Sequence, residues 1–326
     1  MPSSNLNLPH LPIHHASQSY TDEPTRSRTL DLWLPRPLED SDPKKHVWIV
    51  YIHGGAWRDP LQTSQTLLPT LKHLSPIALS KIAGIASIDY RLSPYPKHPD
   101  EPSKPDDAER NVRHPVHIAD VASALNYLGA KWKVGGKDGD SEDDGGEEGG
   151  FKWIGIGHSC GATLLCQYVS RIGLHDSDIK IAGPVGLILL EGIYDLSSFL
   201  KNHKPPKCSP EIAQIYEDIV VGAFTESKEA WKKASPVSGK FTEEQWKEGR
   251  LVYLCYSNED ELVEVEQAVE MRQKLKDDGW SAGKDAGDGR IVERKALHGK
   301  HDWIWEDGTQ IAKRIDEIVE GIAKHL

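Results

Sequence analysis

Short apolar runs recur along the chain, separated by longer amphipathic stretches, and this alternation limits the possible folds more than any other feature. The apolar runs span 29–35, 46–53, 82–89, 151–157, 185–192, 250–257 and 290–297. The stretches between them predict helices over 63–80, 116–132, 160–173, 263–277 and 308–325. Strands and helices in this order form a mostly parallel central sheet with helices on both faces. The first run alternates polar and apolar residues, which predicts an antiparallel edge strand.

Two connections are too long or too irregular for simple crossovers. Residues 93–115 are rich in proline and charge, which predicts a surface excursion without regular structure. Residues 195–249 contain the helical pattern EIAQIYEDIVVGAF, and their length predicts a small helical cap inserted between two strands. The whole chain, 1–326, is long enough to bury the core of a single α/β domain that carries this cap.

The formal net charge of −11 argues against a nucleic-acid partner, because phosphate binding needs a basic face. Residues 135–150 hold seven acids and one lysine, which predicts a solvated, disordered insertion. No apolar run approaches the ~18 residues that span a bilayer, and the N-terminus has no signal-peptide pattern. The cysteines, Cys160, Cys166, Cys208 and Cys255, show neither zinc nor disulfide spacing and are expected to be reduced thiols. We therefore expect a cytoplasmic protein without a nucleic-acid or membrane partner.

A glycine-flanked serine stands between a predicted strand and a predicted helix. The sequence GHSCG at 157–161 ends the run KWIGIG and precedes the amphipathic stretch ATLLCQYVSRIG. In so tight a turn the serine backbone is strained and the flanking positions have no room for a Cβ atom, which explains the glycines. The following helix points its N-terminus at the cleft, where its dipole favours an oxyanion. Ser159 is therefore predicted to be a nucleophile and not part of a merely structural turn.

A serine hydroxyl is a weak nucleophile until a base takes its proton, and a carboxylate must orient that base. On sheets of this kind the acid follows the serine in the chain and the histidine comes last. The sequence SNEDEL follows one late strand, and there Glu259, Asp260 and Glu261 compete for the role of acid. Asp260 is favoured because a shorter side chain holds imidazole more rigidly.

The sequence HGKHDW follows the last predicted strand and offers two histidines as the base. His301 is favoured because it lies in a loop after Gly299, whereas His298 lies almost on the strand, where we expect a partly buried polar residue. A metal site built from both histidines lacks a third ligand at suitable spacing, so no metal is predicted.

The stretch YIHGGAWRD leaves an early strand through two glycines in place of ordinary turn residues. Gly54 and Gly55 let backbone N–H groups face a cleft. One oxyanion donor is expected on the residue after the nucleophile, Cys160, and another on a glycine-rich loop, here at Gly55 and Ala56. His53 ends the strand, where a histidine shapes the loop by hydrogen bonding more often than it acts as a base.

Several motifs together resemble the α/β-hydrolase superfamily and, within it, the fungal serine-dependent kynurenine formamidases (arylformamidases). Lipase and esterase relatives usually have a third glycine where this chain has Trp57. The resemblance extends from about residue 28 to the C-terminus. The motifs are HGGAW at 53–57 (His53, Gly54, Gly55, Ala56, Trp57), DYRLSP at 89–94, GHSCGATL at 157–164, LEGIYDL at 190–196, EDELVEVEQ at 259–267 and HDWIWEDG at 301–308.

The resemblance implies an α/β-hydrolase fold with Ser159 as nucleophile, Asp260 as acid and His301 as base. It implies hydrolysis of N-formyl-L-kynurenine to L-kynurenine and formate, a step of tryptophan breakdown toward NAD, without a metal or organic cofactor. The family is often dimeric, and the sequence neither supports nor opposes a homodimer.

Two further residues are candidates for substrate binding. Trp57 either stacks on the aryl ring of the substrate or packs against the cap. Glu191 either receives the substrate ammonium group or is a solvated or structural carboxylate. The rival functions are a carboxylesterase of broad specificity and a non-catalytic binding protein on the same fold.

Overall fold

A nine-stranded sheet forms the centre of the computed structural model, which describes residues 8–23, 25–136, 150–283 and 289–325. The strand order is β1-β2-β4-β3-β5-β6-β7-β9-β8, with parallel pairing from β4 to β8 and antiparallel pairing at β1 and β2. The strands are β1 (Ile13–Ser19), β2 (Thr29–Leu34), β3 (Val47–Ile52), β4 (Ile82–Ile88), β5 (Trp153–His158), β6 (Gly186–Leu190), β7 (Leu251–Ser257), β8 (Ser281–Ala282) and β9 (Ile291–Leu297).

The predicted strands form within two residues of their expected bounds, but the edge of the sheet was assigned wrongly. The run at 29–35 becomes β2, which is antiparallel as expected but pairs on both sides. The edge strand on this side of the sheet is β1, whose sequence IHHASQS has no buried position. A strand without buried positions has no apolar run, so its sequence carries no strand signal.

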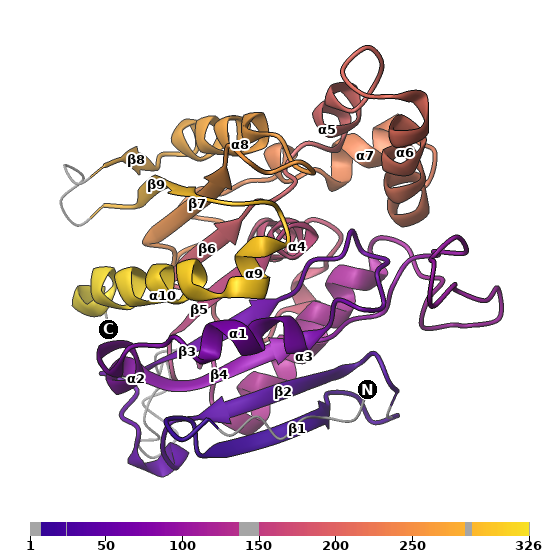
Figure 1. The fold of residues 1–326 in the computed structure, drawn as a ribbon. Coiled ribbons are helices and arrows are strands. Elements are labelled where there is room, and N and C mark those ends of the chain that lie inside the picture. Colours follow the sequence, from indigo (N-terminus) through magenta and orange to yellow (C-terminus); the bar gives the residue numbers. More distant parts are fainter. Residues whose placement is uncertain (1–7, 24, 137–149, 284–288, 326) are drawn as a thin grey trace.

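Helices cover both faces of the sheet (Figure 1). One face packs against α1 (Leu68–Leu71), α2 (Pro76–Lys81), α9 (Trp303–Asp307) and α10 (Thr309–Gly321). The other packs against α3 (Val116–Trp132), α4 (Cys160–Ser170) and α8 (Val265–Asp277). Along β3, alternate side chains enter the two cores, so a continuous apolar run is needed to cover both faces. The helix expected over 63–80 is divided into the 3-10 turn Ser64–Leu67, α1 and α2.

The segment from 195 to 249 folds into three helices between β6 and β7. These are α5 (Leu196–Asn202), α6 (Pro210–Phe224) and α7 (Lys228–Ala234), which contact one another and lie together at one corner of the molecule in Figure 1. Residues 93–115 contain no helix or strand, as expected. Within the acidic insertion predicted at 135–150, residues 137–149 lie outside the described part of the chain. None of the helices in the described residues has the length and apolarity required to cross a membrane.

Candidate active site

The backbone turns sharply at Ser159 between the end of β5 and the start of α4. Ser159 has φ 53° and ψ −122°, a strained conformation for a residue with a side chain. A Cβ atom on Gly157 would lie 2.5 Å from the Ala162 nitrogen, and one on Gly161 would lie 2.2 Å from the Ile52 carbonyl oxygen. Both glycines are therefore required by close backbone contacts, as the motif predicted.

The loops after β7 and β9 bring the favoured acid and base together. Asp260 Oδ2 lies 2.9 Å from His301 Nδ1, and the two side chains are 1% and 5% exposed. The other carboxyl oxygen, Oδ1, accepts hydrogen bonds from the N–H groups of Leu262 and Val263 at 2.8 and 2.9 Å. The backbone N–H groups that follow Asp260 therefore hold its carboxylate in place, and the carboxylate holds the His301 imidazole in place.

The residues that competed with Asp260 and His301 in the sequence make other contacts. Glu259 accepts a hydrogen bond from the Gly299 N–H at 2.9 Å, and Glu261 accepts one from the His301 N–H at 3.2 Å, so both hold the backbone of the histidine loop. His298 is exposed, and its backbone pairs with the Gln310 side chain. The expectation that His298 is partly buried was wrong, because the strand ends before it and the chain turns outward.

The turn at Ser159 (the serine turn) adjoins two other loops. One is the loop after β9 that carries His301 (the histidine loop), and the other is the loop after β3 that begins at Gly54 (the glycine loop). His158, which precedes Ser159, has its ring 4.6 Å from the His301 ring and its Nε2 3.2 Å from the His301 carbonyl oxygen. A Cβ atom on Gly54 would lie 2.6 Å from His158 Nδ1 and 3.2 Å from Ser159 Cβ. Gly54 therefore passes so close to the serine turn that a side chain would displace it.

The loop after β3 has an unusual backbone conformation. Gly55, Ala56 and Trp57 all have positive φ, at 91°, 50° and 59°. The Trp57 N–H donates to Cys160 Sγ at 3.2 Å, whereas the Gly55 N–H has no hydrogen-bond partner among the described residues. Burial raises the pKa of Cys160 to about 11, and hydrogen bonds from Tyr90 and from the Trp57 and Ala56 N–H groups offset part of that rise. The sulfur is therefore a neutral thiol that holds the loop by accepting the hydrogen bond from the Trp57 N–H.

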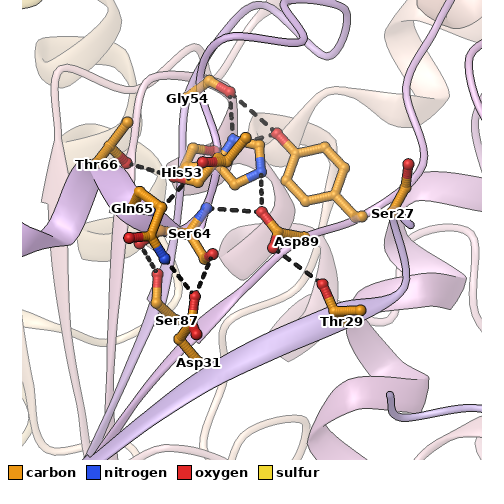
Figure 2. A network of polar contacts seen from close by, with 12 residues as sticks. Ser27, Thr29, Asp31, His53, Gly54, Ser64, Gln65, Thr66, Ser87 and Asp89 are labelled. Atoms are coloured by element: carbon orange, nitrogen blue, oxygen red, sulfur yellow. Dashed lines mark hydrogen bonds and ion pairs between the residues drawn. The ribbon is translucent and has the colours of Figure 1, made fainter. Parts of the chain in front are cut away.

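His53 and Tyr90 fix the start of this loop, where His53 lies beside Gly54 (Figure 2). His53 Nδ1 donates to the Gly54 carbonyl at 2.9 Å, and Tyr90 OH lies within 3.2 Å of the His53 and Gly54 carbonyl oxygens. The two rings stack at 4.5 Å. Burial lowers the pKa of His53 to about 4, only partly offset by its bond to Gly54, so the ring is neutral and shapes the loop, as predicted.

Two acids, Asp31 on β2 and Asp89 directly after β4, extend this support into the sheet, as Figure 2 shows. Asp89 accepts hydrogen bonds from the Ser64 N–H at 2.6 Å and from Thr29 Oγ1 at 3.2 Å, and its Oδ1 lies 3.8 Å from His53 Nε2. Ser64 Oγ donates to Asp31 at 2.8 Å. Sequence reasoning missed this network, although Asp89 and Tyr90 open the DYRLSP motif that contributed to the resemblance.

Both candidate substrate-binding residues are buried. Trp57 is 0% exposed and makes an edge-to-face contact with Phe224 of α6 at 5.0 Å, so it packs against the cap and does not present its ring to a substrate. The Glu191 side chain is 0% exposed and points to His158 and His301. This enclosed position favours the alternative reading of Glu191 as a structural carboxylate.

Two clusters offer ligand atoms within 4.8 Å of one another, one of His158, His301 and Asp302 and one of Glu191, Asp260 and His301. In the second cluster, a metal at His301 Nδ1 would replace the proton that bonds to Asp260 and would thereby break the acid–base pair. The donors of that cluster therefore suit a hydrogen-bonded acid and base better than a cation.

The sheet, the serine turn and the acid–base loops define a chain of the α/β-hydrolase class. Solved structures share this fold: a truncated carbohydrate esterase from gut microbiota has 15% identity and a TM-score of 0.59 over 95% of this chain and 98% of its own. Esterase B from Lactobacillus rhamnosis has 12% identity and a TM-score of 0.62 over 96% and 88%. No protein-family model matches the chain.

Sequence relatives identify the family within this class. The kynurenine formamidase-like hydrolase fscH of Fusarium equiseti is 31% identical over 301 residues, which cover 91% of each chain. The kynurenine formamidase avaC of Aspergillus versicolor is 28% identical, over 88% of this chain and 93% of its own. The kynurenine formamidase of Meyerozyma guilliermondii is 30% identical over 72% and 73%. The chain belongs to the kynurenine formamidase family.

Proposed function

We propose that the chain hydrolyses N-formyl-L-kynurenine to L-kynurenine and formate, through a triad of Ser159, His301 and Asp260. The observation that carries the proposal is the buried pair of Asp260 and His301, joined at 2.9 Å on loops that follow β7 and β9. Their chain order after a strained serine matches the order that this chemistry uses on parallel sheets. The choice of substrate is based on the relatives that are named kynurenine formamidase.

The first half of the reaction forms a formyl-enzyme. Ser159 Oγ attacks the formyl carbon while His301 Nε2 takes its proton, and Asp260 keeps the proton on Nδ1 and stabilises the imidazolium. The oxyanion is bound by the N–H groups of Cys160 and of the glycine loop, at Gly55 and Ala56. Of the two loop groups, Gly55 has the N–H without a competing partner among the described residues.

The second half regenerates the serine. His301 gives its proton to the aniline nitrogen, the C–N bond breaks and L-kynurenine leaves. A water molecule then attacks the formyl ester, His301 again takes the proton and returns it to Ser159 Oγ, and formate leaves. An aryl formamide suits this route because its carbonyl is unhindered and its leaving group is an aniline.

The deciding experiment compares kcat/KM on N-formyl-L-kynurenine and on p-nitrophenyl acetate. We expect a strong preference for the formamide, and a strong preference for the ester would favour a broad carboxylesterase. Ser159→Ala should abolish turnover while circular dichroism remains unchanged. A fluorophosphonate should label the unmodified protein at Ser159, and failure to label would favour a non-catalytic binding protein.

We also propose that the reaction serves tryptophan breakdown toward NAD in the cytoplasm and, from the family resemblance, that the chain forms a homodimer. Cell fractionation and light scattering on the purified chain test the location and the oligomeric state.

A further inference from the structure

Glu191 carries a buried carboxyl group directly behind the proposed base. It follows β6 with φ 50°, in a region that non-glycine residues rarely occupy. Its N–H donates to the Cys255 carbonyl at 2.9 Å, and the Ser159 N–H donates to the Leu190 carbonyl at 2.8 Å. These two bonds connect the backbone at Glu191 to β7 and the backbone at Ser159 to the end of β6. The direction of the Glu191 side chain is therefore fixed by the same backbone segment that holds Ser159.

The carboxyl group contacts two histidines without bonding to either. Glu191 Oε2 lies 3.6 Å from His301 Nδ1 and 3.6 Å from His158 Nε2. Those nitrogens are occupied by closer partners, Asp260 Oδ2 at 2.9 Å and the His301 carbonyl oxygen at 3.2 Å. Neither Glu191 oxygen has a hydrogen-bond partner among the described residues. The group therefore packs against the imidazole pair without competing for its hydrogen bonds.

The surroundings of Glu191 disfavour a negative charge. Burial, followed by the charges of Asp260, Asp302 and Glu261, raises the pKa of Glu191 to about 10. The other neighbouring ring, that of His158, is itself neutral, because burial and then His301 hold its pKa well below the usual range. An ionised carboxylate with no donor or cation is much more costly to bury than a protonated one.

We propose that Glu191 is a positioning residue that works as a neutral carboxylic acid, filling the space behind His301 and leaving Asp260 to carry the negative charge beside the imidazole. A second negative charge 3.6 Å from His301 Nδ1, added to that of Asp260, would stabilise the protonated ring, which cannot take a proton from Ser159. The inference rests on the proposed function in taking His301 as the base, but not in the choice of substrate.

The kinetic test compares Glu191→Ala, which removes the carboxyl group, with Glu191→Gln, which keeps a neutral group of the same shape. We expect the alanine variant to lose about 100-fold in kcat with little change in KM, because the imidazole is no longer held in place. The glutamine variant should retain most of the wild-type kcat, and the acidic limb of its kcat/KM pH profile should stay at the wild-type position. Glu264→Ala is the matched control, because Glu264 lies 3.8 Å from another histidine, His203, beside the cap; it should leave kcat and the acidic limb unchanged.

Either of two kinetic results would overturn the proposal. A shift of the acidic limb to lower pH by one unit or more in Glu191→Gln would show that the native group is an anion. Unchanged kcat in Glu191→Ala would show that it positions nothing. Running the series on both N-formyl-L-kynurenine and p-nitrophenyl acetate separates a wrong substrate from a wrong role for Glu191.

Infrared spectroscopy tests the charge state without any substrate and without the alanine variant. The wild-type protein at neutral pH should show a protonated-carboxyl band that disappears in Glu191→Gln. A carboxylate band that disappears instead would contradict the proposal, whatever reaction the enzyme catalyses.

Discussion

Three consecutive acids in the loop after β7, Glu259, Asp260 and Glu261, each bond to a different group of the histidine loop. Asp260 bonds to the His301 ring, while the longer Glu259 and Glu261 bond to the N–H groups of Gly299 and His301. The shorter side chain points inward from its own turn and the longer ones reach along the neighbouring loop. The ring and the backbone of the base are therefore held by separate residues.

Replacing the three acids one at a time should separate these roles. Asp260→Asn should lower kcat by about 10⁴-fold, because an amide can hold the wrong tautomer of His301. Glu259→Gln and Glu261→Gln keep an oxygen for the loop N–H groups, so their losses should be much smaller. Steady-state kinetics on N-formyl-L-kynurenine measures all three, and equal losses in Asp260→Asn and Glu261→Gln would contradict the assignment.

The two histidines after β9 provide a second comparison of buried and exposed side chains. His301→Ala should abolish turnover because Ser159 loses its base, whereas His298→Ala should have little effect because that ring is exposed and contributes only its backbone to Gln310. Loss of activity in His298→Ala alone would reverse the choice. Thermal unfolding of both variants serves as the control for folding.

The loop after β3 and the helix α4 pack backbone to backbone, and glycine makes this possible. Gly161 brings α4 against the carbonyl oxygens of Ile52 and His53, at 2.2 and 2.7 Å from where its Cβ atom would lie. Gly54 brings the loop against the serine turn from the other side. The proposed oxyanion donors of loop and helix therefore converge because neither backbone carries a side chain at the contact.

A methyl group on Gly54 should separate these elements. Gly54→Ala places Cβ 2.6 Å from His158 Nδ1, so the loop must move away from Ser159. We expect kcat to fall by about 10²- to 10³-fold, the effect of losing one oxyanion donor, with a smaller change in KM. Gly222→Ala on α6 is the matched control, because its Cβ atom would meet only the Pro94 carbonyl oxygen, at an ordinary 3.7 Å. Equal kcat in both variants would argue against a donor on this loop.

Regular elements could be predicted where burial leaves a pattern in the sequence, and not elsewhere. The runs that became β3 and β4 are buried at every position, and α3 spans the predicted 116–132. The strand β1 was missed because none of its positions is buried. The site divides in the same way. The serine, acid and histidine follow strand ends in a known order, but a glutamate such as Glu191 normally faces solvent, and its burial depends on contacts between distant segments.

The polar network in Figure 2 connects the antiparallel edge of the sheet to the proposed oxyanion loop. Asp31 on β2 and Asp89 after β4 both bond to Ser64, and the Asp31 carboxylate also accepts the Ser17 N–H of β1 at 3.1 Å. From Asp89 the contacts continue to His53 at 3.8 Å. The antiparallel strands β1 and β2 thus support the loop through polar side chains inside the molecule, and the charge state of Asp89 should affect the stability of the whole fold.

Asp89 should make stability depend on pH. Burial raises its pKa from 3.8 to about 6, with hydrogen bonds from Ser64 opposing that rise, so the folded state binds the proton more tightly than the unfolded state. The resulting stabilisation is complete below about pH 3.8 and is lost as pH rises through about 6. A shift of this size corresponds to about 3 kcal/mol at most, because the side chain is 18% exposed.

Asp89→Asn removes this titration, since an amide keeps the shape of the side chain and does not ionise. Relative to the variant, the wild-type free energy of unfolding should fall by about 1 to 1.5 kcal/mol between about pH 5 and pH 7.5, the part of the transition that lies in this range. Urea unfolding followed by tryptophan fluorescence at several pH values measures the difference. Thr29→Val removes the hydrogen bond from Thr29 to the Asp89 carboxylate, so it should move the transition to higher pH. Parallel pH curves for the wild type and Asp89→Asn would mean that Asp89 is ionised in the folded protein across the whole range.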